Sequence, residues 1–388
     1  MISRTLASGV ALALATGLLS TLTALVPVAP AAAASCAANA DAPVVADPSW
    51  GQQRMGAERA WPRSTGEVTV AVIDTGVSAK TPSLRGAVLA GSDLSGGRGD
   101  VDCFGRGTFI ASLIAARQVD GTEFAGVAPG ATILPIRVTD DPAEFERQGD
   151  PGRLAAAIDA SVRAGARVIA LSLTVTEDDS RLRRAVQAAV DEDVLVVAPA
   201  AGPSGKAAFP ARMDDVLAVA PLTPSGPVES GQIGAPPDLA APSMDLTAAV
   251  PDGPGHIGGS DPSLAVAYVA AAAALVMDEQ PQLSAGQVGQ RLIDTADAAA
   301  TASGAESERD PSMGYGVVNP VAALTRLSAT AAPLPPPEPA TLALPPTPDA
   351  RPGNLAIAVA LGILVLAVAV IGPTVGVVLV RRRRAAEE

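Results

Sequence analysis

The chain has 388 residues, enough for one large domain with additional terminal segments. Hydrophobic residues make up 48% of the sequence and aromatic residues only 2%, so the apolar content consists mainly of Ala, Val, Leu and Ile, which suits helices packed on a parallel sheet. A formal net charge of -13 argues against nucleic acid as the main partner.

Residues 1–34 have the pattern of a secretory signal peptide. Arg4 supplies a positive start, an apolar run extends from Ala7 to Val28, and the alanines after Pro30 are small enough for cleavage. The alternative is that this segment stays as a membrane anchor. Residues 35–66 follow as a polar, irregular N-terminal arm, which we expect to lie over the domain.

The chain contains two cysteines, Cys36 and Cys103. In an exported protein the two can form a disulfide, which would stabilise the domain by about 4 kcal/mol in the chain-entropy model. The alternative is two unpaired, buried thiols. The export signal favours the disulfide.

Buried strands and helices alternate through the domain at 67–327. Near-continuous Val and Ile runs predict strands that are covered on both faces of a sheet. The predicted strands lie within 67–77, 126–138, 167–174, 194–198 and 216–220. The predicted helices are 108–116, 154–164, 180–192, 261–277 and 284–295. This alternation predicts an α/β fold with a doubly wound parallel sheet and helices on both faces, in which 140–152 is a polar loop.

The C-terminal region has the pattern of a membrane anchor. Residues 328–353 are dense in proline and predict an extended linker. Residues 354–380 are apolar and long enough to span a bilayer as one transmembrane helix, and the alternative, a buried core helix, fits poorly after such a linker. Four arginines begin the tail at 381–388, which places it in the cytoplasm and the domain outside the cell membrane.

Three short motifs carry the chemistry of the domain. Asp74 ends a predicted strand, Arg106 lies in a Gly-Arg-Gly-Thr turn before a helix, and Ser263 follows Asp261 and Pro262 at another helix start. A strand-end Asp, a glycine-flanked helix start and a late Ser form the layout of a Ser-His-Asp hydrolase in the order Asp, His, Ser. Arg106 stands where that layout requires a His.

Five segments in this order resemble the subtilisin-like serine proteases, and more closely the mycosins, which are membrane-anchored subtilases of type VII secretion systems. These segments read AVIDTGV, DCFGRGTFIASLIAA, GVAPGATILPIRV, LAVAYVAAAAALV and GYGVVNPVAAL. The resemblance covers residues from about 48 to 327. It implies a parallel core of the seven-stranded type, an extracytoplasmic serine endopeptidase, and partners among the type VII secretion membrane components.

The resemblance implies catalytic roles for Asp74, at the place of the triad Asp, and for Ser263, at the place of the nucleophile. Simple structural roles compete with both, because Asp74 can cap its turn and Ser263 can merely follow the helix cap Asp261. The register from Tyr268 favours Ser263 as the nucleophile over its neighbour Ser260.

Two positions depart from the family pattern. Arg106 replaces the triad His, cannot act as a general base, and is expected to form an ion pair with Asp74. Pro203 replaces the oxyanion Asn, and the loss of one such donor costs about 100- to 1000-fold in rate. The only His, His256, is predicted to be a loop or strand residue rather than a substitute base.

These departures make a catalytically inactive subtilase, or pseudoprotease, the leading hypothesis. The alternatives are an active serine endopeptidase with a different base and an extracellular adhesion or sensing module. We expect no cofactor and no metal, since one His and no cysteine cluster exclude an ordinary zinc site. The acidic loop at 93–102 could bind calcium but is expected to be solvated.

Overall fold

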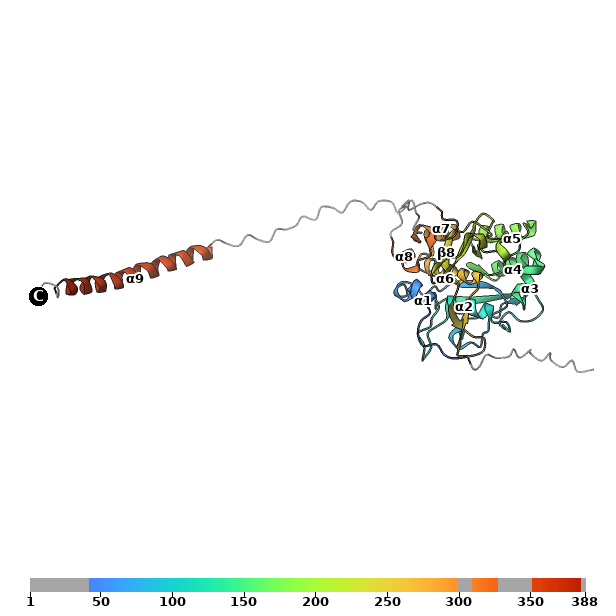
Figure 1. Cartoon of the computed structure of the whole chain (residues 1–388), viewed down its shortest axis with the longest axis horizontal. Coiled ribbons are helices and arrows are strands. Elements are labelled where there is room, and N and C mark those ends of the chain that lie inside the picture. Colours follow the sequence, from blue (N-terminus) through green and yellow to red (C-terminus); the bar gives the residue numbers. More distant parts are fainter. Residues whose placement is uncertain (1–41, 299–308, 327–350, 385–388) are drawn as a thin grey trace, which may run out of the picture. The chain divides into compact units, whose positions relative to one another are not determined.

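The computed structural model describes residues 42–298, 309–326 and 351–384. The predicted signal peptide, Cys36, most of the proline-rich linker and the end of the tail lie outside the described residues, so the disulfide to Cys103 stays a prediction. The chain divides into two compact units, residues 1–328 and 329–388. Figure 1 shows the elements of each unit.

A largely parallel sheet forms the centre of the first unit. Eight of its strands run parallel, in the spatial order β12 (Gly316–Val317), β8 (Leu239–Pro242), β6 (Val216–Thr223), β5 (Leu195–Pro199), β4 (Val168–Leu171), β1 (Thr69–Asp74), β3 (Thr132–Arg137) and β2 (Ser92–Asp93). Two short antiparallel strands complete it, β11 (Asp297–Ala298) beside β12 and β7 (Gly226–Pro227) beside β6. The doubly wound fold is confirmed, while the sheet has more strands than the seven-stranded type implied.

Alternate residues of β1 enter two separate hydrophobic cores, as expected for a strand covered on both faces. Val70 and Val72 pack in one core with α2 (Arg106–Ala115) and α6 (Ala265–Glu279). Ala71 and Ile73 pack in the other with α4 (Pro151–Arg163) and α5 (Ser180–Asp191). The lack of charge in the first thirteen residues of α6 agrees with their complete burial.

Most of the helices begin at side-chain caps that the sequence supplies. Asp150 and Asp179 accept backbone N–H groups at the starts of α4 and α5, and Ser284 forms a capping box with Gln287 at the start of α7 (Ala285–Asp294). The last helix of this unit, α8 (Pro320–Thr325), is capped by Asn319.

The structure corrects the sequence-based elements at two places. The region 140–152, predicted as a polar loop, contains the helix α3 (Pro142–Gln148), which Asp141 caps and Pro142 begins. The predicted helix from 261 begins as a short 3-10 helix, η5 (Pro262–Leu264), and becomes α-helical at Ala265. Both places lie at the candidate site.

The described part of the N-terminal arm contains two short helices, α1 (Trp50–Met55) and η1 (Ala57–Arg59). Backbone and side-chain hydrogen bonds attach it to the domain, including Trp50 Nε1 to the Met244 carbonyl at 2.8 Å and Trp61 Nε1 to the Val127 carbonyl at 3.0 Å. A two-stranded sheet of β9 (Leu246–Ala249) and β10 (His256–Gly259) borders it, because His256 N donates to the Pro43 carbonyl.

The second unit contains one long apolar helix, α9 (Arg351–Arg384). Its segment Gly353–Arg383 has a mean hydropathy of 3.0 and none of it is buried within the protein. Helix α6 is also long and apolar enough to span a membrane, but 83% of the tested segment is buried, as in the core helix of a soluble domain. Helix α9 is therefore the candidate membrane anchor.

Candidate active site

The candidate site lies at the carboxyl end of β1, between β3 and β4. The chain passes from β1 to β3 on one side and then returns to β4 on the other, so β1 ends at the topological switch point of the sheet. Ligands of doubly wound sheets bind at such points. Asp74 is the last residue of β1 and its side chain is completely buried.

A close approach fixes the start of α2 against the turn after β1. A Cβ atom on Gly107 would lie 1.9 Å from the Gly76 carbonyl oxygen, so only glycine fits there. Gly76 itself has a φ of +98°, in the region that glycine favours. The two glycines therefore bring residue 106 next to Asp74.

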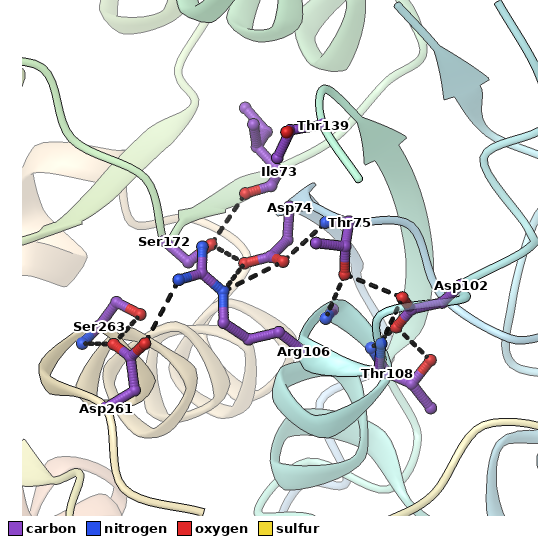
Figure 2. A network of polar contacts seen from close by, with 12 residues as sticks. Ile73, Asp74, Thr75, Asp102, Arg106, Thr108, Thr139, Ser172, Asp261 and Ser263 are labelled. Carbon is purple, nitrogen blue, oxygen red and sulfur yellow. Dashed lines mark hydrogen bonds and ion pairs between the residues drawn. The ribbon is translucent and has the colours of Figure 1, made fainter. Parts of the chain in front are cut away.

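Asp102 holds this junction together through its carboxylate (Figure 2). It accepts hydrogen bonds from Thr75 Oγ1 at 2.9 Å, from Gly105 N at 2.7 Å, and from the backbone and hydroxyl of Thr108 at 2.8 and 2.7 Å. Burial raises the pKa of Asp102 to about 6, although the hydrogen bonds from Gly105 and Thr108 lower it, and the nearby charge of Asp74 raises it further. Sequence reasoning did not identify this residue.

Arg106 lies between two carboxylates in the centre of the site (Figure 2). Its Nε is 3.0 Å from Asp74 Oδ2 and 3.3 Å from Asp74 Oδ1, and its Nη1 is 3.3 Å from Asp261 Oδ2. The expected ion pair with Asp74 is present, but it is not bidentate through two guanidinium nitrogens. Arg106 instead contacts Asp74 through Nε and Asp261 through Nη1. Burial lowers the pKa of Arg106, yet the charges of Asp74, Asp261 and Glu146 outweigh it and raise the pKa above its usual value.

Asp261 links this pair to the candidate nucleophile. Its Oδ1 accepts hydrogen bonds from Ser263 Oγ at 2.6 Å and from Ser263 N at 2.8 Å. Ser263 is 4% exposed. The structure thus brings together three sequence-predicted site residues, Asp74, Arg106 and Ser263, and adds Asp261, which sequence reasoning treated only as a helix cap. These four residues are called the charged network below.

The charged network places an arginine and two aspartates around Ser263 and contains no histidine. A guanidinium stays protonated and has no lone pair to accept the Ser263 proton. An oxyanion hole needs free donors such as the N–H of the nucleophile, and here the Ser263 N–H is bound to the Asp261 carboxylate. Pro203, in the 3-10 helix η3 (Pro203–Gly205), has no side-chain donor to replace it.

Two more residues approach the charged network from elements that sequence reasoning did not assign to the site. Ser172, just after β4, donates its hydroxyl to Asp74. Glu146 lies on α3. Burial and the charges of Asp261 and Asp74 raise its pKa more than the charge of Arg106 lowers it, so the pKa is above its usual value. The serine directly after a buried strand could have been noticed in the sequence, whereas nothing in the local pattern placed α3 near Arg106.

The other serine and histidine candidates have different partners. Ser260 is exposed and exchanges hydrogen bonds with Asp245, accepting from its backbone N at 2.9 Å and donating to its Oδ1 at 3.2 Å. His256 is buried, accepts a hydrogen bond from Val45 N on Nδ1 at 3.1 Å, and packs against Phe124 at 4.9 Å. Burial lowers the pKa of His256. The contacts of His256 are therefore with Val45 of the arm and with Phe124.

No group of three or more His, Cys, Asp or Glu side chains suited to a metal ion occurs among the residues that the structure describes. Asp93, the last residue of β2 and the first of the acidic loop at 93–102, lies with its Oδ2 3.5 Å from Arg137 Nη1 and accepts a hydrogen bond from Ser95 N. Its side chain is 1% exposed, so the expectation of a solvated loop is wrong at this residue.

Comparisons with known proteins match the same region of the chain. The model of the subtilase family matches residues 65–316. Mycosin-3 of Mycobacterium tuberculosis is 32% identical, over 87% of this chain and 84% of its own length, and subtilisin DY of Bacillus licheniformis is 32% identical over 59% and 83%. Among solved structures, the MycP3 protease of a type VII (ESX-3) secretion system is 30% identical with a TM-score of 0.62, covering 73% of this chain and 91% of that one. A chain in the periplasmic assembly of the ESX-5 inner membrane complex is 29% identical with a TM-score of 0.62, covering 77% and 89%.

Proposed function

The chain belongs to the subtilase family, and we propose that it is a membrane-anchored, mycosin-like member of a type VII secretion system that no longer cleaves peptides. In this proposal the domain acts through binding or through stabilisation of the secretion complex. The C-terminal helix α9 anchors it, with the domain outside the membrane and the arginine-rich end in the cytoplasm.

The position of Arg106 carries the proposal of inactivity. It occupies the place of the general base, and its positive charge is held between Asp74 and Asp261. Ser263 therefore has no imidazole to take its proton, and removal of such a base abolishes most of the activation of a serine. Pro203 and the bound Ser263 N–H remove both expected oxyanion donors.

An active peptidase would need Asp261 as its base, because that carboxylate is the acceptor of the Ser263 hydroxyl. The same carboxylate also accepts the Ser263 N–H and pairs with Arg106. A carboxylate that holds both the hydroxyl and the N–H of the nucleophile leaves that N–H unable to stabilise an oxyanion. The contacts therefore favour the inactive protein.

The relatives support the proposed setting. The MycP3 protease is described as part of a type VII (ESX-3) secretion system, and related chains occur in structures of the ESX-5 inner membrane complex. Helix α9, whose segment Gly353–Arg383 has a mean hydropathy of 3.0, is consistent with anchoring in the membrane that holds such a complex. We accordingly propose type VII membrane components as partners.

Labelling of the full-length, detergent-solubilised protein with a fluorophosphonate serine probe, read by intact mass, tests the proposed inactivity. We expect no adduct, and no turnover of an unfolded protein substrate above that of the Ser263→Ala variant. A stoichiometric adduct that disappears in Ser263→Ala would contradict the proposal. Ser260→Ala serves as the matched control, since that serine is exposed and its hydroxyl bonds to Asp245 and not to the side chains of the charged network.

A further inference from the structure

A polar pocket of about 280 Å³ lies far along α2 from the charged network, where the arm meets the loop after this helix. Pro48 of the arm forms part of its wall. The remaining lining residues are Gln52, Gln53, Glu58, Trp61, Gln118 and Glu123. No lysine, arginine or histidine lines it, although it contains two carboxylates. This volume is slightly below that of pockets for drug-sized ligands, so it suits a single side chain.

Three side-chain donors around this pocket, on Gln52, Gln53 and Trp61, are already bound to the protein. Gln52 Nε2 donates to the Glu123 carbonyl at 2.7 Å, and Gln53 Nε2 donates to the Pro48 carbonyl at 2.9 Å. Trp61 Nε1 donates to the Val127 carbonyl at 3.0 Å. These bonds hold the two amides and the indole in place. Because its N–H is already bonded, the indole can contact a ligand only through the carbon atoms of its ring.

The side-chain oxygens of Gln52, Glu58 and Glu123, by contrast, accept no hydrogen bond from the residues that the structure describes. Gln52 Oε1 is buried without a hydrogen bond, which is a costly state for an acceptor. The side chains of Glu58 and Glu123 are exposed, and neither forms an ion pair with the residues that the structure describes. The pocket therefore presents the negative charge of Glu58 and Glu123, which a ligand with positive charge and several N–H donors complements.

We propose that this pocket binds a guanidinium group, presented by an arginine side chain of a partner protein. A guanidinium carries five N–H donors in a rigid plane, which suits several oxygen acceptors at once, and it stacks on an indole face. An ammonium group has three donors and no flat face, so it fits the fixed Trp61 ring less well. The pocket shares no residue with the charged network, so this inference stands or falls independently of the proposed loss of catalysis.

Ligand-observed NMR on the full-length, detergent-solubilised protein tests the proposal with acetyl-Gly-Gly-Arg-Gly-Gly-amide as the probe. We expect saturable binding that is at least about tenfold tighter than that of the citrulline peptide, because hydrogen bonds between charged groups are the stronger ones. Agmatine is a small molecule with the same guanidinium, and it tests whether the pocket binds a free guanidinium compound in preference to an arginine side chain of a protein. It should bind no more tightly than the peptide.

A charge-matched pair of variants locates the site. Glu58→Gln/Glu123→Gln should weaken binding of the arginine peptide by at least about tenfold, whereas Glu177→Gln/Glu192→Gln, which changes the net charge equally at exposed positions outside the pocket, should not. The proposal is overturned by equal binding of the citrulline peptide, by equal weakening in both variants, by binding of agmatine alone, or by no saturation at about 10 mM peptide.

Discussion

Replacing Arg106 with methionine tests whether its guanidinium is the counter-charge that keeps Asp74 in the fold. Methionine retains an unbranched apolar stem at the start of α2 but carries no charge. Asp74 is 0% exposed, and Arg106 is its ion-pair partner in the part of the chain that the structure describes. The variant would leave a buried carboxylate with only Ser172 and the Thr75 N–H as donors.

Removing one partner of a buried ion pair destabilises a protein by about 3–5 kcal/mol. The second acid, Asp261, adds at most about 1 kcal/mol, because its side chain is 37% exposed and water can solvate it. In a domain of this size 1 kcal/mol corresponds to about 2–4 °C, so a total of about 3–6 kcal/mol should lower the Tm by roughly 6–24 °C. Thermal unfolding of the full-length protein, followed by near-UV circular dichroism, measures this change.

Two further variants test whether the fall in Tm comes from the unpaired Asp74 carboxylate or from the lost packing of the Arg106 side chain. Asp74→Asn in the Arg106→Met background removes the unpaired carboxylate and should recover most of the lost Tm. Arg181→Met removes an exposed arginine of α5 and should leave the Tm nearly unchanged. A fall of less than about 2 °C in Arg106→Met, or a further fall on adding Asp74→Asn, would refute the reasoning.

Two other predictions concern the arm and the start of α2. Because burial lowers the pKa of His256 in the fold, the unfolded chain gains a proton first as the pH falls below about 6.5, and stability should decrease there by at most about 1.4 kcal/mol per pH unit. His256→Gln, whose amide oxygen can still accept the Val45 N–H, should remove this contribution in unfolding measured from pH 7.5 to 5.5 and leave the opposite contribution of Asp102, whose pKa of about 6 in the fold makes stability rise as the pH falls; an unchanged pH profile would be contrary evidence. Gly107→Ala should cost about 1–3 kcal/mol or more through the clash with Gly76, whereas Gly286→Ala on α7, which meets no atom within 4 Å, should not destabilise; equal denaturation midpoints for both variants would contradict the close approach.

The residues of the charged network depend on one another in their physical effects. An arginine at position 106 would be unfavourable with no acids around it, and Asp261 supplies a second one beside Asp74. Asp261 in turn fixes both polar groups of Ser263. We expect that Arg106→His alone would leave Ser263 bound to Asp261, so under the proposed inactivity this single change would not give peptidase activity.

The amino-acid sequence by itself determined the local elements of this protein. The run Val70 to Ile73 predicted a buried strand, since its four apolar residues are continuous and its alternate side chains need a core on each face of the sheet. Caps such as Ser284 specified the starts of helices. The absence of charged residues between 355 and 380 specified the apolar helix α9. The motif order also predicted that residues 74, 106 and 263 share one site, because the loops at the carboxyl edge of a doubly wound sheet converge.

Only the tertiary structure decided which partners these residues have. Helix α3 was missed because its sequence is short and polar, and only its cap and its packing through Phe145 reveal it. Asp261 read as a simple helix cap, since one residue can cap a helix and receive a distant arginine with the same carboxylate. Residues 106 and 261 lie far apart in sequence, and no local pattern reports the distance or the orientation of a guanidinium. That arrangement follows from packing the two helices against the end of β1, which is a property of the whole fold.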